Sequence, residues 1–182
     1  MLIVLVAVVV LAGGYVVLYN RLVSLRVRGE NAWSDIDVQL KRRADLVPNL
    51  VSTVKGYAAH ERGTLEAVTQ ARTGAVAAQS AGPAVRAQAE AQLTTALRGL
   101  TVAVEAYPDL QASAGFRDLQ AQLATIEDAI GNSRRYYNAV VRDLNTAIST
   151  IPSKYVAGPM GYHELEFFEA SAGDRELPKV TF

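Results

Sequence analysis

An apolar run near the start of the chain constrains the fold more than any other feature. Leu2–Tyr19 contains eighteen residues and no charged side chain. As an α-helix rising about 1.5 Å per residue, the run would be about 27 Å long, close to the thickness of a bilayer's hydrocarbon core. A helix also bonds its backbone polar groups internally, as the membrane interior requires. We therefore predict a transmembrane anchor over residues 1–20.

Two other interpretations of this run stay open. A cleaved signal peptide typically has basic residues followed by an apolar core of about 7–15 residues, whereas here only Met1 precedes a longer run. A buried core helix is the other alternative. Arg21, Arg26 and Arg28 follow the run. Because basic residues flanking a span favour the cytoplasmic side, these arginines predict a cytoplasmic location for the domain that follows.

Beyond the anchor, apolar residues recur at helical spacing. From Trp33 to Ala58 they follow one another at steps of three and four residues, which places them on one face of a helix. We expect Trp33 to be a packing residue. Pro48 lies inside this pattern and removes one backbone hydrogen bond, so a kink is expected there.

Three further helices are predicted, over about Glu61–Gln79, from Pro83 to Tyr107, and from Ser113, as N-cap, to Ile151. The inward-facing residues expected in them are Leu65, Val68, Val76, Val85, Ala89, Leu93, Leu97, Leu100, Val104, Phe116, Leu119, Leu123, Ile126, Ile130, Tyr137, Val141, Leu144, Ile148 and Ile151. The predicted fold class is therefore all-α. An N-terminal transmembrane helix precedes an antiparallel four-helix bundle over residues 21–152, with long first and last helices.

Residues 153–182 form a C-terminal segment of different composition, with prolines, glycines and an excess of acidic side chains. We expect one or two helical turns over His163–Glu169, where Phe167 and Phe168 cover the bundle. After Ala170 we expect a flexible tail. The segment is therefore predicted to be partly docked and then flexible.

Composition and motifs exclude several classes of protein. Eighteen basic residues balance eighteen acidic ones, so no global field attracts nucleic acid. The chain has no cysteine, which excludes a disulfide framework and Cys-ligated metals. Neither His60 nor His163 has the glutamate three residues earlier that a diiron site needs, or the second histidine of HExxH. We expect no catalytic residues, no metal and no cofactor.

Polar residues form three clusters, over residues 31–61, 105–110 and 134–145. One interpretation is that they make interhelical ion pairs, which fix helix register. The other is a polar groove that binds a partner or ligand. The candidates for such an interaction site or polar network are Asp35, Gln39, Arg42, Arg43, Asp45, Asn49, Glu105, Glu127, Arg134, Arg135 and Asn138. The membrane-flanking arginines Arg21, Arg26 and Arg28 are also suited to contact anionic lipid.

The same polar clusters carry a family resemblance. The chain contains QLKRRADLVPNLVSTVKGYAAHE over residues 39–61, Glu105-Ala106-Tyr107-Pro108, and a polar run from Arg134 to Asn138. In these features it resembles the LemA family, from the apolar run to about Glu169. The resemblance implies a bacterial protein of the inner membrane, with a single N-terminal span and a helical bundle in the cytoplasm. It implies no enzymatic activity and transfers no catalytic residues.

Together these observations predict a non-enzymatic, single-pass membrane protein. Its helical domain would act as a membrane-tethered scaffold or protein-interaction module. The alternative is a membrane-linked sensor or signal relay, in which ligand binding shifts helix packing. The expected partners are the lipid bilayer and a protein of unspecified identity, with self-association left open.

Overall fold

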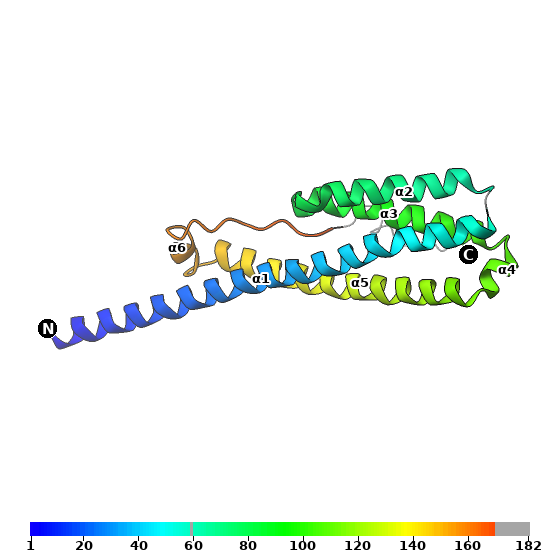
Figure 1. Ribbon diagram of the computed structural model, residues 1–182. Coiled ribbons are helices and arrows are strands. Elements are labelled where there is room, and N and C mark those ends of the chain that lie inside the picture. Colours follow the sequence, from blue (N-terminus) through cyan, green and yellow to red (C-terminus); the bar gives the residue numbers. More distant parts are fainter. Residues whose placement is uncertain (59, 170–182) are drawn as a thin grey trace, which may run out of the picture. The chain divides into compact units, whose positions relative to one another are not determined.

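The computed structural model describes residues 1–58 and 60–169. Its elements are α1 (Leu2–Tyr57), α2 (Arg62–Ala77), the short 3-10 helix η1 (Ala78–Ser80), α3 (Pro83–Val104), α4 (Pro108–Ala112), α5 (Ala114–Ser149) and α6 (Lys154–Ala157) (Figure 1). No strand occurs in this part of the chain. The predicted all-α class, with a long apolar helix at the N-terminal end, is confirmed.

The first helix is 56 residues long and contains both the apolar run and the predicted stripe that starts at Trp33. Pro48 lies inside α1, and the helix continues through it. Val47 and Leu50, on either side of the proline, are buried. The packing of these two side chains offsets the loss of the backbone hydrogen bond that Pro48 cannot donate.

Contacts divide the chain into two compact units. Among the described residues, unit 1 comprises residues 1–35 and 133–167, and unit 2 comprises residues 36–132 together with Phe168 and Glu169. Helices α1 and α5 each contribute residues to both units. The domain limits expected from the sequence, at residues 20 and 152, stay predictions.

Unit 2 encloses an apolar core to which α1, α2, α3, α4, α5 and Ala58, just after α1, contribute. Its buried members are Val47, Leu50, Val54, Ala58, Leu65, Val68, Ala75, Leu93, Leu97, Leu100, Val104, Leu110 and Phe116. Helices α2 and α3 pack side by side and are joined by η1 (Figure 1). Pro83 occupies the first turn of α3 as predicted. The amide of Phe116 donates to Ser113 Oγ at 3.4 Å, in keeping with the predicted N-cap.

Three of the expected inward positions are wrong. Val76, Val85 and Ile151 are exposed. On α3, a step of eight residues from Val85 to Leu93 leaves the two side chains about 80° apart around the helix, at about 100° per residue. The face that contains Leu93 instead extends back to Glu90 and Arg86, which are buried. On α2, Ala75 takes the inward position expected for Val76.

The short helix α4 was not predicted. Pro108 lies in its first turn and Leu110 is buried in the core of unit 2. The sequence indicated only that Tyr107-Pro108 ends the preceding helix, since proline restricts the residue before it.

Unit 1 has its own apolar core. The buried members are Leu22 of α1, Leu144 and Ala147 of α5, and Val156 and Ala157 of α6. The rings of Trp33 and Tyr137 lie 5.3 Å apart between centroids, with an interplanar angle of 52°. Trp33 is therefore a packing residue, as expected.

The helix predicted over His163–Glu169 is wrong, because residues 162–169 lie outside any helix. Side chains of α5 bind the backbone of this segment instead. Asn145 Nδ2 donates to the Leu165 carbonyl and Oδ1 accepts from the Leu165 amide, both at 2.9 Å. The Tyr137 hydroxyl donates to the Glu166 carbonyl at 2.9 Å. Phe168 is buried, and the predicted flexible tail from residue 170 lies outside the described residues.

Replacement of Asn145 by alanine is expected to release this segment from α5. The change removes two hydrogen bonds, each worth about 0.5–1.5 kcal/mol. Amide exchange at Leu165 should therefore accelerate by about five- to 150-fold, which mass spectrometry of the exchanging protein can measure. Asn49→Ala, at an exposed position on α1, is the matched control and should leave Leu165 unchanged. Unchanged protection in Asn145→Ala would contradict the docking contact.

Candidate functional site

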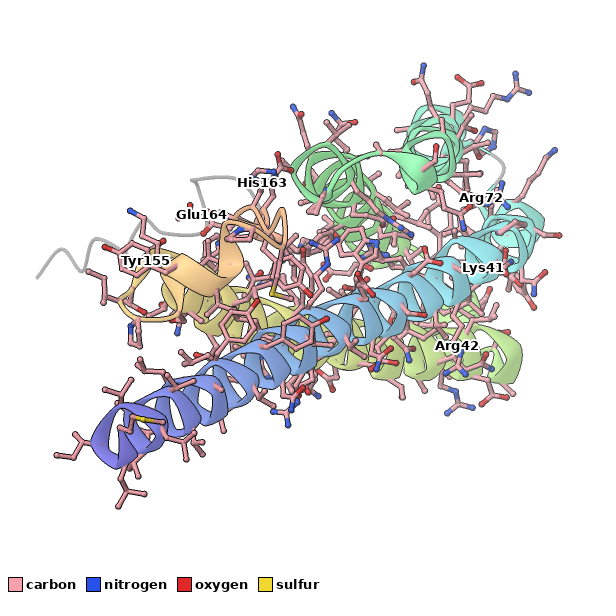
Figure 2. All side chains as sticks on the ribbon, turned by 90° about the vertical axis from the view of Figure 1, so that its left-hand side faces the viewer. Lys41, Arg42, Arg72, Tyr155, His163 and Glu164 are labelled. Carbon is pink, nitrogen blue, oxygen red and sulfur yellow. The ribbon has the colours of Figure 1, made fainter. Side chains whose placement is uncertain are left out.

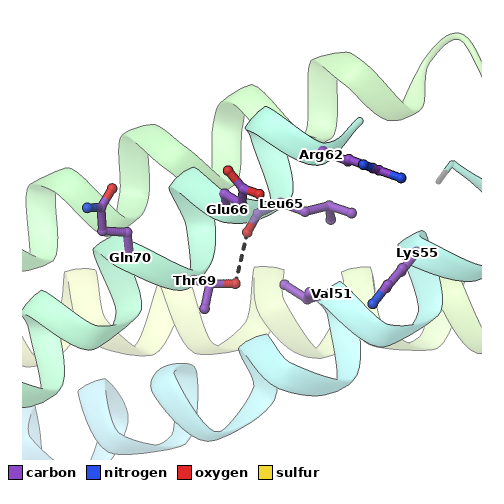
Figure 3. A pocket seen from close by; sticks show the side chains of 7 residues that line it. All are labelled: Val51, Lys55, Arg62, Leu65, Glu66, Thr69 and Gln70. Carbon is purple, nitrogen blue, oxygen red and sulfur yellow. Dashed lines mark hydrogen bonds between the residues drawn. The ribbon is translucent and has the colours of Figure 1, made fainter. Parts of the chain in front are cut away.

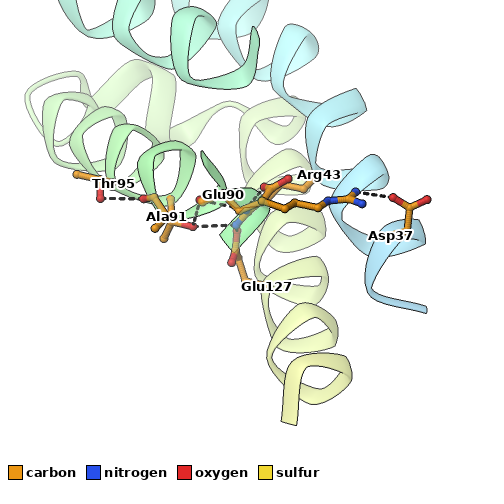
Figure 4. A network of polar contacts seen from close by, with 8 residues as sticks. Asp37, Arg43, Glu90, Ala91, Thr95 and Glu127 are labelled. Atoms are coloured by element: carbon orange, nitrogen blue, oxygen red, sulfur yellow. Dashed lines mark hydrogen bonds and ion pairs between the residues drawn. The ribbon is translucent and has the colours of Figure 1, made fainter. Parts of the chain in front are cut away.

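Arg43 is a buried charged residue of unit 2, and its side chain is 2% exposed. Its Nη1 donates to Glu127 Oε1 at 2.6 Å and to Thr94 Oγ1 at 2.9 Å. Its Nη2 donates to Glu90 Oε2 at 2.5 Å (Figure 4). One guanidinium therefore joins α1 to both α3 and α5.

A second buried arginine of unit 2, Arg86, is 3% exposed. Its Nη2 donates to Asp37 Oδ1, and its Nη1 donates to the Gln79 carbonyl at 3.1 Å. The two ion pairs between α1 and α3 are thus reciprocal. In one pair α1 supplies the arginine, Arg43, and in the other α3 supplies it. We call Asp37, Arg43, Arg86, Glu90 and Glu127 the crossed ion-pair network.

Desolvation determines what this network can do. Moving a charged group out of water costs several kcal/mol, which only a well-placed partner offsets. Glu90 is 6% exposed, and its carbonyl also accepts from Arg43 Nη2 at 3.3 Å and from Thr94 Oγ1 at 3.0 Å. Slippage of α3 along α1 by one turn would separate both ion pairs. The geometry therefore suits the fixing of helix register.

Two of the candidate residues from the sequence, Arg43 and Glu127, meet in this network. The other candidates lie elsewhere, in half-buried or exposed positions. Gln39, Arg134 and Asn138 are half-buried, and Asp35, Arg42, Asp45, Asn49, Glu105 and Arg135 are exposed. Asp45 accepts a hydrogen bond from Lys41 Nζ at 2.9 Å on the surface of α1.

Sequence reasoning missed Asp37, Arg86 and Glu90 as site residues; on α1 it pointed to the exposed Asp35 instead of Asp37, and on α3 it named neither Arg86 nor Glu90. One signal was present for the α3 residues: Arg86 and Glu90 lie four residues apart, on the face of α3 that contains Leu93 and Leu97. A pair of opposite charges at this spacing on an apolar face indicates that both charges find partners on another helix.

Tyr107 is bound by Glu61 in unit 2. The Tyr107 hydroxyl donates to Glu61 Oε1 at 3.0 Å. The hydrogen bond to this carboxylate raises the pKa of Tyr107 above its ordinary value, and desolvation and the charge of Glu61 act in the same direction. In unit 1, burial raises the pKa of Tyr137; the charge of Glu166 adds to this effect and that of Arg26 opposes it.

A cavity of about 650 Å³ lies where residues of α1 and α2 face each other in unit 2 (Figure 3). Its lining consists of Val51, Lys55, Arg62, Leu65, Glu66, Thr69 and Gln70. The lining combines apolar side chains with charges of both signs. Within the described residues, no three His, Asp or Glu side chains gather in a way that would hold a metal ion.

The apolar start of α1 differs from every other helical segment of the described chain. Its most apolar window of eighteen residues has a mean hydropathy of 2.7, and none of that window is buried. Residues 1–17 are all exposed, and Leu18 and Leu22 make the first packing contacts of α1. The three arginines expected to flank a membrane, Arg21, Arg26 and Arg28, follow in unit 1. Arg26 Nε donates to Glu30 Oε1 at 2.8 Å, and its guanidinium lies 5.9 Å from the centre of the Tyr162 ring.

These features define a class of protein: an all-helical chain whose first helix is long and apolar enough to cross a membrane. The profile of the LemA family matches residues 32–182, and the chain belongs to this family. The resemblance seen in the sequence is thereby confirmed.

Curated proteins also match most of the chain. Magnetosome protein MamQ of Magnetospirillum gryphiswaldense is 27% identical over 184 residues, which cover 87% of this chain and 68% of MamQ. Magnetosome protein MamQ 2 of Paramagnetospirillum magneticum matches with the same identity and coverage. Protein LemA of Metamycoplasma hominis is 27% identical over 148 residues, covering 80% of this chain and 66% of that protein.

Proposed function

We propose that the chain is a non-enzymatic, single-pass membrane protein whose helical domain serves as a membrane-tethered scaffold or protein-interaction module. The observation that carries this proposal is the uncovered apolar start of α1. A core helix of a soluble protein has its apolar side chains covered by other elements, whereas residues 1–17 are exposed throughout. An apolar surface of this length is stable in a bilayer and costly in water.

The anchor and the folded domain share one helix in this proposal. Leu18 and Leu22 pack in the core of unit 1 and follow the exposed turns without a break in α1. The exposed Arg21 and Arg28 lie on either side of Leu22 in the chain. Basic residues at this point favour a cytoplasmic domain on the inner membrane of a bacterium.

The domain itself is proposed to be an antiparallel four-helix bundle with long first and last helices. The shared core of α1, α2, α3 and α5 in unit 2 supports this arrangement. The crossed ion-pair network supports a scaffold role, because both pairs resist sliding of α3 along α1. A rigid domain of this kind presents a constant surface to a partner.

The cavity lined by α1 and α2 favours a second candidate function. A ligand bound there would contact both helices and shift their packing, as a membrane-linked sensor or signal relay requires (Figure 3). Lys55 and Arg62 would favour an anionic ligand. Neither candidate function involves a cofactor, a catalytic residue or nucleic acid.

Photo-crosslinking in intact membranes tests the scaffold proposal. A benzophenone amino acid would replace Val102 on α3 or Glu66 beside the cavity, each in the full chain, since Val102 is exposed and Glu66 lines the cavity. A scaffold should give discrete crosslinked species at one of these positions, with another protein or with a second copy of the chain. The same probe at the buried Leu93 is the control. Absence of discrete products at both test positions would contradict a stable scaffold.

A further inference from the structure

The turn between α5 and α6 exposes two large apolar side chains. Ile151 is 72% exposed and Tyr155 is 71% exposed. Among the described residues outside the apolar start of α1, these are the most exposed large apolar side chains. The opposite side of α6 is firmly packed, since Val156 and Ala157 are 4% and 1% exposed. The outward position of Tyr155 is therefore fixed by the packing of its neighbours.

Packing within unit 1 places this turn beside the end of the apolar run. Val156 and Ala157 belong to the same core as Leu22, against which Leu18 also packs. Leu22 lies only about 5 Å along the helix axis from Tyr19, the last residue of the run, at about 1.5 Å per residue. Helix α6 accordingly lies next to α1 at the point where its apolar turns end (Figure 1), and Tyr155 is on α6 (Figure 2).

The chemistry of the turn matches the boundary between lipid tails and water. Tyrosine is enriched at this level because its ring is apolar and its hydroxyl is polar. Tyr15 and Tyr19 already stack there, with ring centroids 6.5 Å apart. Lys154 lies between these two residues in the sequence and is exposed. Its side chain is long enough for the ammonium group to reach lipid phosphate groups while the aliphatic stem stays at the apolar boundary.

We propose that the turn from Ile151 to Tyr155 docks into the headgroup region of the same bilayer that α1 crosses. This inference rests on the proposed membrane anchor and adds a second, peripheral contact from a distant part of the chain. The partner of this turn is lipid, because the turn lies beside the end of the span, where lipid headgroups surround α1. Ile151 and Tyr155 enter the boundary layer, and Lys154 pairs with lipid phosphate.

Spin labelling of the full chain tests the proposal directly. The chain has no cysteine, so single substitutions give unique labelling sites. Ile151→Cys and Tyr155→Cys would each be labelled with a nitroxide and reconstituted in vesicles of phosphatidylethanolamine and phosphatidylglycerol. Collisions with oxygen, which partitions into lipid, are compared with collisions with a water-soluble nickel chelate.

Tyr136→Cys is the matched control, an exposed tyrosine on α5 about 20 Å before the end of that helix. Labels at 151 and 155 should collide more often with oxygen, and less often with the nickel chelate, than the label at 136. The label at 151 keeps Tyr155 in place, so it reports the docked turn with its tyrosine intact.

Val9→Cys separates this proposal from the anchor on which it rests. If the label at 9 reports bilayer interior while those at 151 and 155 collide with nickel as freely as the label at 136, the docking of the turn is overturned and the anchor stands. If the label at 9 also reports water, the anchor itself fails. Lipid exposure at 9 together with interfacial values at 151 and 155 would support both.

Discussion

Replacement of Arg43 by methionine is expected to lower the free energy of unfolding by about 3–5 kcal/mol. The substitution leaves the buried Glu90 carboxylate without its guanidinium partner and removes the link from α1 to Glu127. Methionine fills much of the space of arginine, so the loss reports the uncompensated charge more than a cavity. Chemical unfolding of the full chain in detergent, followed by helical circular dichroism, measures the change.

The neighbouring arginine provides the control for this prediction. Arg42 is exposed, and Arg42→Met should change the stability by no more than about 0.5 kcal/mol. Adding Glu90→Leu and Glu127→Leu to Arg43→Met should restore most of the lost stability, because apolar side chains of similar size replace a buried ion pair at little cost. Equal stability of Arg43→Met and Arg42→Met would refute the structural role of the network.

Two arginines within the apolar run are expected to prevent membrane insertion. Val6→Arg together with Val10→Arg costs about 5–7 kcal/mol, at about 2.5–3.5 kcal/mol for each charge near the centre of a spanning helix. Both valines are fully outside the packed core, so the change leaves the contacts of the folded units intact. The native chain should stay in the membrane after alkaline carbonate extraction, whereas the variant should move to the soluble fraction.

The control places the same charges on exposed positions of the helical domain. Val76 on α2 and Val102 on α3 are exposed, and Val76→Arg with Val102→Arg should leave the chain in the membrane fraction. Retention of the Val6→Arg, Val10→Arg variant after extraction would show that the apolar run is not what holds the chain in the membrane.

Apolar periodicity predicted the buried face of α1 well. Ile36, Leu40, Val47 and Val54 are all buried, as their spacing indicates. Long helices with a single apolar face are the elements most easily predicted from a sequence, because the apolar pattern repeats over many turns. The helix limits at Pro83 and Ser113 followed from local chemistry, since both residues favour helix starts.

The candidate site was harder to predict, because a sequence does not distinguish a charged residue that is buried from one that lies on the surface. Arg86 and Glu90 take inward positions on α3 where apolar residues are usual, and the apolar pattern pointed instead to Val85, which is exposed. The carboxylate and guanidinium partners of Arg86 and Glu90, Asp37 and Arg43, come from α1 and lie far away in the sequence, and these partners offset the cost of burying the two charges. The pairing of Asn145 with Leu165 likewise joins residues 20 positions apart and replaced the helix expected for that segment.

The crossed ion-pair network also has a consequence for the order of events during synthesis. The partners of Arg43 follow it by 47 residues at Glu90 and by 84 at Glu127. At about 5–20 residues per second, translation delivers Glu127 roughly 4–17 seconds after Arg43. The arginine thus emerges from the ribosome without its acidic partners, while the apolar run has already emerged. We expect the nascent chain to be threaded into the bilayer first and its domain to close only afterwards.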